Sequence, residues 1–426
     1  MGATALVFIG TMLIGVPIAF VLGASSLFHF LFEIPIPLEM IGQKLYSGID
    51  NYVLLAIPFF MFAGELMNRA KITESIFEFA DLIVGRIPGG LAQANCLDSV
   101  FFAGITGSGV ADTAALGSIE IPVMVKAGYK KEYAAAVTIA SSVIGPIIPP
   151  SIVMVVYSTV TGESIRSLFA AGFIPGILIA LSLMILCYYY AIKEKHPRRT
   201  RKLTLSEIWK VVKNSFVALL TPVILIGGIF SGKFTPTEAA AISCLYAMIA
   251  GLFILRTLTL KDIIDSLVSA AISASVVLII ISIASLFGQV MAIDRIPQKI
   301  GQLIIGLTSN KYIYLLLVNI LCLFMGMIME TSASVILLAP ILVPIAINLG
   351  IHPLHFALVM LVNLNIGLIT PPVGVCIYAA SAITGLSLEK ISKAAIPFIT
   401  AEIIALLVMT YVPDFILFLP RILGYI

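Results

Sequence analysis

Charged residues are scarce in this sequence, and their scarcity decides the broad class of the protein. Aspartate, glutamate, lysine and arginine make up 11% of the 426 residues, whereas hydrophobic residues make up 60%. Soluble domains carry about 25% charged residues, so a soluble globular domain is excluded. The net charge of +3 is too small to indicate a nucleic-acid partner.

Cysteine and histidine are too few and too scattered to indicate a disulfide framework or a metal centre. The five cysteines stand singly in apolar stretches, and each is expected to be a small buried hydrophobic residue. The four histidines are expected at the surface, because His352 and His355 flank a proline in a loop and no third ligand is visible. No nucleophile–base pair and no His-Glu-x-x-His helix is present, so we predict that the chain is not an enzyme.

Long hydrophobic runs fill the chain instead, and the mean hydropathy of the whole chain, +1.12, is that of an integral membrane protein. We predict an all-α polytopic membrane protein with about eleven to thirteen membrane segments, some of them half-spans. The N-terminus lacks a basic segment and an Ala-x-Ala cleavage site, so residues 3–32 are expected to form an uncleaved first span.

Two matching phrases interrupt two of these apolar runs. IGPIIPP occupies residues 144–150, and IGLITPP occupies residues 366–372. Proline removes a backbone N–H and clashes with the preceding turn, so each phrase is expected to unwind its helix. Freed carbonyls are tolerated in a bilayer only where they face protein, water or an ion. A matched pair of broken helices is typical of a transporter's binding site.

The two phrases belong to an internal repeat. Gly145 and Gly367 are 222 positions apart, and this offset aligns about seventy residues without a gap. Further matches at the same offset are Gly104 with Gly326, Pro122 with Pro344, Gly128 with Gly350, Val153 with Val375, Pro175 with Pro397, and Ile177 with Ile399. The chain is therefore predicted to contain two copies of one structural unit.

Lysine and arginine indicate how the two copies are oriented. The loop 126–131 carries three lysines, whereas the equivalent loop 346–355 carries no lysine or arginine. The next loop reverses the bias, with Arg166 alone in the first copy and Lys390 and Lys393 in the second. Because cytoplasmic loops collect lysine and arginine, equivalent loops are expected on opposite faces. The repeats are therefore predicted to be inverted.

Each copy is predicted to begin with a re-entrant hairpin around a small-residue tip, followed by a broken helix. The stretches outside the copies carry no such break and are expected to be ordinary spans. The predicted division is 1–86, scaffold helices; 87–186, first repeat with a hairpin entering from the cytoplasm; 187–309, scaffold helices with the cytoplasmic basic loop 193–202; and 310–426, second repeat with a hairpin entering from the periplasm.

Six motifs together resemble one family of membrane proteins. They are LLAIPFF at 54–60, GSGVAD at 107–112, PPS at 149–151, FTPTEAA at 234–240, ETSA at 330–333 and GLITPPVG at 367–374. In this order, and over nearly the whole chain, they resemble the large membrane subunit of tripartite ATP-independent periplasmic (TRAP) transporters, the DctM-like family.

The resemblance implies a function that the residues alone do not establish. It implies sodium-gradient-driven import of an organic anion, such as sialic acid or a C4-dicarboxylate, with an elevator movement of the transport domain against the scaffold. It also implies a small four-helix membrane subunit and a periplasmic substrate-binding protein as partners, in the bilayer of the bacterial inner membrane. The alternative is a sodium/carboxylate symporter of related fold that works without a binding protein.

The two breaks are the predicted binding sites of the coupling ion. Unwound backbone exposes carbonyl oxygens, and half-helix C-terminal ends carry negative partial charge. The predicted Na⁺ ligands are Gly104, Gly145, Ile148 and Ser151 in one site, and Gly326, Gly367, Thr370 and Val373 in its repeat mate. We expect no other metal and no cofactor. The alternative is that these residues only bend helices for packing.

Substrate is expected between the hairpin tips, where hydroxyls and N–H groups at helix N-termini could hold a carboxylate. The candidate residues are Thr106, Ser108, Asp112, Glu330, Thr331, Ser332, Ser334, Asn363 and Asn365. Close helix packing for the small residues, and helix–helix hydrogen bonding for the asparagines, are the alternatives. Asp112 and Glu330 could instead pair with a neighbouring helix terminus.

Four other carboxyl groups are given structural interpretations. Glu65, Asp98 and Glu120 are expected near segment ends, at the membrane interface. Glu238 follows Thr235 by three positions, with proline between them, and is expected to complete a capping box at the start of a helix.

Overall fold

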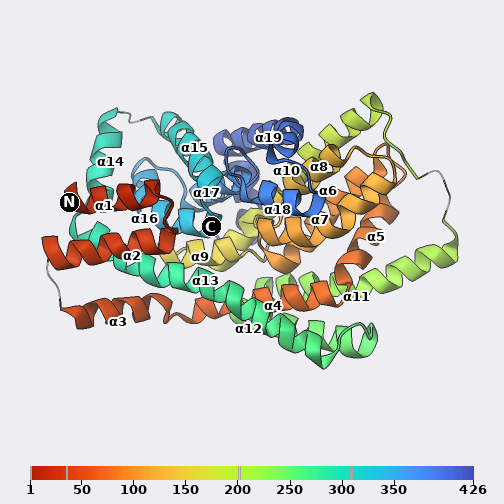
Figure 1. Cartoon of the computed structure of the whole chain (residues 1–426), viewed down its shortest axis with the longest axis horizontal. Coiled ribbons are helices and arrows are strands. Elements are labelled where there is room, and N and C mark those ends of the chain that lie inside the picture. Colours follow the sequence, from red (N-terminus) through yellow and green to blue (C-terminus); the bar gives the residue numbers. More distant parts are fainter. Residues whose placement is uncertain (1, 35–36, 200, 202, 308–309) are drawn as a thin grey trace.

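The computed structural model describes residues 2–34, 37–199, 201, 203–307 and 310–426, without the side chains of residues 2, 38, 104–106, 301 and 303–307. Every regular element in these residues is a helix (Figure 1). Seven of the described helices are long and apolar enough to cross a membrane, and a bent pair raises this number to eight. The all-α membrane fold class is therefore confirmed, and the remaining predicted segments are shorter apolar helices.

The two repeats and the regions outside them have the following helices. The N-terminal region holds α1 (Gly2–Leu13), α2 (Ile18–Phe28), the π-helix η1 (His29–Glu33), α3 (Leu38–Ile49), the 3₁₀-helix η2 (Tyr52–Leu55), α4 (Ala56–Arg69) and α5 (Ile72–Val84). The first repeat holds α6 (Gly90–Thr106), α7 (Gly109–Lys126), α8 (Lys131–Ser141), the 3₁₀-helix η3 (Ser142–Ile144), α9 (Ile152–Thr161) and α10 (Ile165–Lys193). The central region holds α11 (Leu205–Phe230), α12 (Pro236–Ile249), the π-helix η4 (Ala250–Ile254), α13 (Leu260–Ile293) and α14 (Ile296–Leu307). The second repeat holds α15 (Lys311–Ile328), α16 (Thr331–Asn348), α17 (Pro353–Gly367), α18 (Val375–Thr384), α19 (Leu388–Tyr411) and α20 (Asp414–Ile422).

Capping boxes begin all three long helices of the central region. In α12 the hydroxyl of Thr235 accepts from the N–H of Glu238 at 3.3 Å, and the Glu238 carboxylate accepts from the N–H of Thr235 at 2.7 Å. The predicted capping role of Glu238 is therefore confirmed. Thr204 and Thr259 make the same reciprocal bonds at the starts of α11 and α13. These bonds satisfy N–H groups that a helix start leaves without intrahelical partners.

The longest helix, α13, joins the N-terminal region to the second repeat. It packs against α2, α3 and α4 and also against α16 (Figure 1). Ser282 on α13 donates to the carbonyl of Leu45 on α3 at 2.7 Å, and Ser269 donates to the Glu65 carboxylate on α4 at 3.2 Å. The regions outside the repeats thus form one packed layer beside them.

The N-terminal region differs from the expected unbroken spans in two places. Residues 3–32 do not form one span, because the chain turns at Gly15, whose φ is +81°, and Pro17 starts the next helix. The Thr4 hydroxyl lies 3.2 Å from Nδ1 of His29, so the start of α1 meets the end of α2 and the two helices form a hairpin. A second break separates α3 from α4, and the chain bends by 55° between these two helices.

The helix boundaries repeat at the offset found in the sequence. Helices α7 and α16 both begin and end 222 positions apart, and α8 and α17 begin 222 positions apart. The turn between them contains Gly128 in one copy and Gly350 in the other, with φ values of +103° and +73°. Because both copies need the left-handed conformation at this position, glycine occupies it in each.

Each repeat packs one half-helix against the hairpin of the other repeat. The half-helix α9 of the first repeat packs against the hairpin arm α16 of the second, and α18 of the second packs against α7 of the first. A Cβ atom at Gly117 on α7 would lie 3.2 Å from Cδ1 of Ile383 on α18, so these two helices approach closely. Each hairpin is therefore supported by the half-helix of the other copy.

Contacts between loops agree with the predicted inversion. Nζ of Lys130 lies 2.8 Å from Oε2 of Glu194, and the hydroxyl of Tyr129 donates to the carbonyl of Pro197 at 3.2 Å. The hydrogen bond from Lys130 holds the pKa of Glu194 below its usual range. The lysine-rich loop of the first repeat therefore lies on the same face as the basic loop 193–202, as the rule for cytoplasmic loops requires.

The loop after α9 lies on the opposite face. A Cβ atom at Gly232, just past the far end of α11, would be 3.7 Å from Nη1 of Arg166. Since α11 starts beside the basic loop and is long enough to span, its end marks the other side of the membrane. The equivalent loop of the second repeat follows α18, which packs against α7. Leu368, before α18, lies near Gly109 and Ile383, near its end, lies near Gly117, so α18 runs in the direction of the C-terminal end of α7. Equivalent loops thus lie on opposite faces, and the inverted-repeat prediction is confirmed.

Candidate functional site

The tip of the first hairpin rests on the first broken helix. Helix α6 ends at Thr106, and Gly107 adopts a φ of +62° before α7 begins at Gly109. A Cβ atom on Gly107 would lie 2.7 Å from the Pro150 carbonyl oxygen and 3.2 Å from Cα of Ser151. Both the left-handed φ and this close approach require glycine at the tip.

The first break is a fully buried stretch between α8 and α9. After η3 the chain has no regular structure until Ile152, and the Pro149–Pro150 peptide bond is cis. Ser151 ends the break by capping α9, because its hydroxyl accepts from the N–H of Met154 at 3.2 Å and donates to the Pro146 carbonyl at 2.5 Å. Carbonyl groups released by the unwound turn are thus brought to the hairpin tip.

The second hairpin meets the second break in the same way. A Cβ atom on Gly326 would lie 2.5 Å from the Leu364 carbonyl oxygen and 3.0 Å from Cα of Gly367. The N–H of Gly374 donates to the Met327 carbonyl at 3.2 Å, so backbone bonds to backbone across this contact. The Pro371–Pro372 bond is cis, like its repeat mate.

The beginning of α7 lies between the two breaks. A Cβ atom on Gly109 would lie 3.2 Å from the Ser142 carbonyl oxygen, 3.8 Å from Cδ of Pro146 and 3.7 Å from Cδ1 of Leu368. One hairpin tip therefore touches both broken helices. Asp112, one turn further along α7, is buried with its carboxylate against the backbone of Gly145.

The predicted ion-site residues differ in their burial and in the oxygen atoms that they could offer to an ion. Thr370 is buried, and its hydroxyl donates to the Ile366 carbonyl at 2.7 Å, which leaves the oxygen lone pairs for another partner. Ile148 and Gly145 belong to the buried first break, whereas Val373 is only partly buried. Gly104 lies in α6, but its surroundings are outside the described part of the chain.

Several predicted substrate residues make helix contacts. The Glu330 carboxylate caps α16 by accepting from the N–H groups of Ser332 at 2.8 Å and Ala333 at 3.2 Å. The Asn363 amide donates to the carbonyl of Asn319 on α15 at 2.8 Å. Glu330 thus pairs with a helix terminus and Asn363 links two helices, which are the structural alternatives given for these residues above.

The other predicted substrate residues lie at the two tips. Thr331 donates to Oδ1 of Asn365 at 3.1 Å, which joins the second tip to the second broken helix. Ser334 is fully buried on α16, and Ser108 lines a cavity beside the first tip. The side chain of Thr106 is outside the described residues.

A cavity of about 480 Å³ separates the first hairpin from the layer formed by α4 and α13. Ser108 and Ser118 line it from α7 and its tip, and Glu65, Asn68 and Ser273 line it from the opposite wall. A second cavity, of about 420 Å³, lies between the same layer and helices α9 and α16. A cavity with both polar and apolar lining residues therefore lies between the repeats and the neighbouring layer beside each half of the site.

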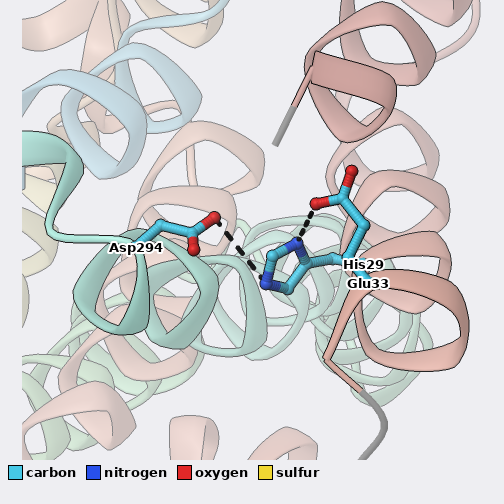
Figure 2. A group of neighbouring side chains, drawn as sticks. All are labelled: His29, Glu33 and Asp294. Carbon is cyan, nitrogen blue, oxygen red and sulfur yellow. Dashed lines mark hydrogen bonds and ion pairs between the residues drawn. The ribbon is translucent and has the colours of Figure 1, made fainter.

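Histidine does not form the expected surface set. His29 and His355 are buried, and Nε2 of His355 lies 3.0 Å from the Met409 carbonyl oxygen. Figure 2 shows His29 between two carboxylates, with Nδ1 at 3.0 Å from Glu33 and Nε2 at 3.7 Å from Asp294. Because the carboxylates face different ring nitrogens, the arrangement suits a polar contact that joins η1 to the end of α13 better than a shared metal ion.

Two carboxyl groups differ from the expected interfacial position. Asp98 lies in the middle of α6 and Glu120 lies inside α7, and both are fully buried, so their assignment to segment ends is wrong. The burial of these two carboxyl groups could not be predicted from the sequence, because hydropathy does not show which faces of α6 and α7 meet. Glu65 is half-buried and lines the larger cavity.

Comparison with known proteins places this geometry in a family. The model of the DctM component of the tripartite ATP-independent periplasmic transporter matches residues 5–415. The chain belongs to this family. It is 39% identical to the sialic acid TRAP transporter large permease protein SiaM of Vibrio cholerae, over 98% of both chains. It is 40% identical to the C4-dicarboxylate TRAP transporter large permease protein DctM of Pseudomonas aeruginosa, over 95% of this chain and 94% of the relative.

Solved structures share the fold of this DctM-family chain. The Alcanivorax borkumensis YdaH transporter superposes with a TM-score of 0.65 at 15% identity, covering 96% of this chain and 97% of the other. Neisseria gonorrhoeae MtrF superposes with a TM-score of 0.59 at 14% identity, covering 92% of both chains. The chain is thus a multi-pass transporter permease, and the relatives' names agree with the prediction that it is not an enzyme.

Proposed function

We propose that the chain imports an organic anion, driven by a sodium gradient, after a periplasmic binding protein has delivered the anion. The observation that carries this proposal is the contact of one hairpin tip with both broken helices, seen at Gly109. Membership of the DctM family supports the transport class. The repeats would form the transport domain, and the layer around α4 and α13 would form the scaffold along which it slides.

Sodium would bind where the breaks release carbonyl oxygens. One site would use Gly104, Gly145, Ile148 and Ser151, and the other would use Gly326, Gly367, Thr370 and Val373. Main-chain oxygens of a broken helix suit a hard cation. The Na⁺ charge would then help to hold an anion at the adjacent N-terminal ends of α7 and α16.

The carboxylate would bind between the tips and the larger cavity. Its ligands would be the hydroxyls at the two tips, and the two hairpin carboxyls, Asp112 and Glu330, would shape the site. Relatives are named for sialic acid, for C4-dicarboxylates and, in Oleidesulfovibrio alaskensis, for isethionate. These substrates are all organic anions, and that class is the one we propose here.

The remaining parts of the system would be a small four-helix membrane subunit and a soluble periplasmic protein. The complex would lie in the bacterial inner membrane. The basic loop and Lys130 form the cytoplasmic face in this arrangement, which supports delivery of substrate from the other side.

Uptake into proteoliposomes tests this function. We expect saturable, electrogenic uptake of a labelled carboxylate only with an inward Na⁺ gradient and with both partners present. Uptake that persists when the Na⁺ gradient is collapsed, or uptake driven by ATP, would contradict the proposal. Sodium-dependent uptake without the binding protein would favour the alternative symporter.

A further inference from the structure

A buried polar cluster inside the first hairpin has no place in the proposed ion and substrate sites. It centres on Asp98 of α6 and Glu120 of α7, which lie within hydrogen-bonding reach of each other. Asn95, one turn before Asp98, donates to Oε2 of Glu120 at 2.5 Å and to the Thr138 hydroxyl at 2.8 Å. Ser141 donates to Oδ1 of Asn95 at 2.7 Å and so fixes the orientation of the amide.

Three oxygen atoms of this cluster lack a hydrogen-bond donor in the described part of the chain. They are both carboxyl oxygens of Asp98 and Oε1 of Glu120, and both side chains are fully buried. A buried carboxylate without a partner is costly, so such groups bind a cation or take up a proton. Two carboxyls facing each other can share one proton and convert a repulsive contact into a hydrogen bond.

Among the described residues, no cationic side chain offsets these charges. Titratable groups near the cluster are Asp112 on α7, Cys96 on α6, Cys187 on α10, Tyr133 on α8 and Glu402 on α19. All of these groups are neutral or anionic, and no described lysine, arginine or histidine acts on either carboxyl of the pair. The surroundings therefore favour uptake of positive charge by the pair.

The second repeat does not carry the polar residues of this cluster. At the offset of 222, Asp98 corresponds to Ile320, Glu120 to Leu342, Asn95 to Leu317 and Thr138 to Met360. Leu342 and Met360 are buried, whereas Leu317 and Ile320 on α15 are exposed. The buried polar cluster at these positions is therefore found in the first hairpin and not in its repeat mate.

A proton fits the cluster better than a metal ion. The Asn95 amide turns its NH₂ group toward Glu120, and its oxygen is occupied by Ser141. An N–H dipole aimed into the cluster repels a metal cation, and the three oxygens without donors are fewer than a hard cation such as Ca²⁺ takes. A shared proton needs only the two facing carboxyls.

We propose that Asp98 and Glu120 form a proton-binding site in the first hairpin, holding one shared proton in the transport-competent protein. Loss of this proton at alkaline pH leaves two adjacent buried negative charges between α6 and α7. The hairpin is then forced apart or must take in water, and transport slows. This site is additional to the two sodium sites.

Infrared spectra of the purified protein test the site without requiring transport. We expect the C=O stretching band of a protonated carboxyl at neutral pH, its loss at alkaline pH, a shift of its frequency in Asp98→Asn and in Glu120→Gln, and its absence from the double variant Asp98→Asn/Glu120→Gln. Glu402→Gln is the matched control, because it removes another fully buried carboxyl and should leave the band of the pair. If the double variant keeps this band, or if Na⁺ abolishes the band at neutral pH, the proposal is wrong.

Uptake measurements test the consequence, which rests on the proposed function. Sodium-driven uptake by the complete transporter should fall about tenfold per pH unit once the pair has lost its proton. The double variant Asp98→Asn/Glu120→Gln should keep its uptake over the same range, because its amides cannot lose a charge-neutralising proton. An undiminished alkaline decline in that variant would overturn the link to transport. Loss of uptake at every pH in wild type would count against the transport function, and the spectra would still decide the site.

Discussion

Thr370 is the residue through which the second break can offer a polar side chain as well as backbone carbonyls to an ion. Its hydroxyl already donates to Ile366 and therefore points its lone pairs away from that carbonyl. The equivalent position of the first break holds Ile148, which has no oxygen in its side chain. The two proposed sodium sites thus differ in one ligand.

Replacing Thr370 by alanine should raise the Na⁺ concentration needed for half-maximal uptake about fivefold, since one neutral ligand contributes about 1 kcal/mol. Thr370→Ser is the matched control, because it keeps the hydroxyl and should stay close to wild type. Sodium titrations of uptake check both variants. An unchanged Na⁺ requirement in Thr370→Ala would leave Thr370 with a packing role alone.

The roles of some individual residues could be predicted from the sequence, whereas the burial of others could not. Glycines at the tips and breaks could be predicted because backbone geometry demands them wherever a tip meets a broken helix. Asp98 and Glu120 could not, because their burial depends on the rotation of α6 and α7 about their axes. His29 was missed for a related reason, since Asp294 reaches it from a helix distant in the sequence.

Between elements, hairpin and broken helix meet through backbone atoms. The contact of Gly326 with Gly367 and with the Leu364 carbonyl leaves no room for a methyl group. This close approach lets the hairpin present its carbonyl groups beside those of the break.

Gly326→Ala should therefore destabilise the second repeat by about 1–3 kcal/mol, the usual range for overpacking. Gly227→Ala on α11 is the control, because a Cβ atom there meets nothing within 4 Å and alanine favours helix. Thermal unfolding of the two purified variants gives the comparison. Equal melting temperatures for Gly326→Ala and wild type would contradict the close contact.

Element boundaries were predictable inside the repeats and less so outside them. Two copies of one pattern show which prolines and glycines end helices, because each boundary is seen twice. The hairpin of α1 and α2 had no such second copy, and its apolar run is long enough for a single span. Its turn became evident only from the contact between Thr4 and His29.

For the whole molecule, the inverted arrangement predicts which loops face which side. Lys130 starts α8 beside the basic loop, and His352 starts the equivalent helix α17 of the other copy. Cysteine substituted at Lys130 should react with a membrane-impermeant thiol reagent only from the cytoplasmic side, and cysteine at His352 only from the periplasmic side. Labelling of both from the same side would refute the inversion.

The exchange of half-helices between the copies also constrains how the protein is made. Helix α7 leaves the ribosome long before α18, the partner that covers it, and the whole central region must be inserted in between. Until the C-terminal part of the chain has been inserted, the face of α7 that packs against α18 therefore has no protein partner. Truncation of the chain after α17 should leave a product that the cell's quality control degrades, even though every residue of the first copy is present.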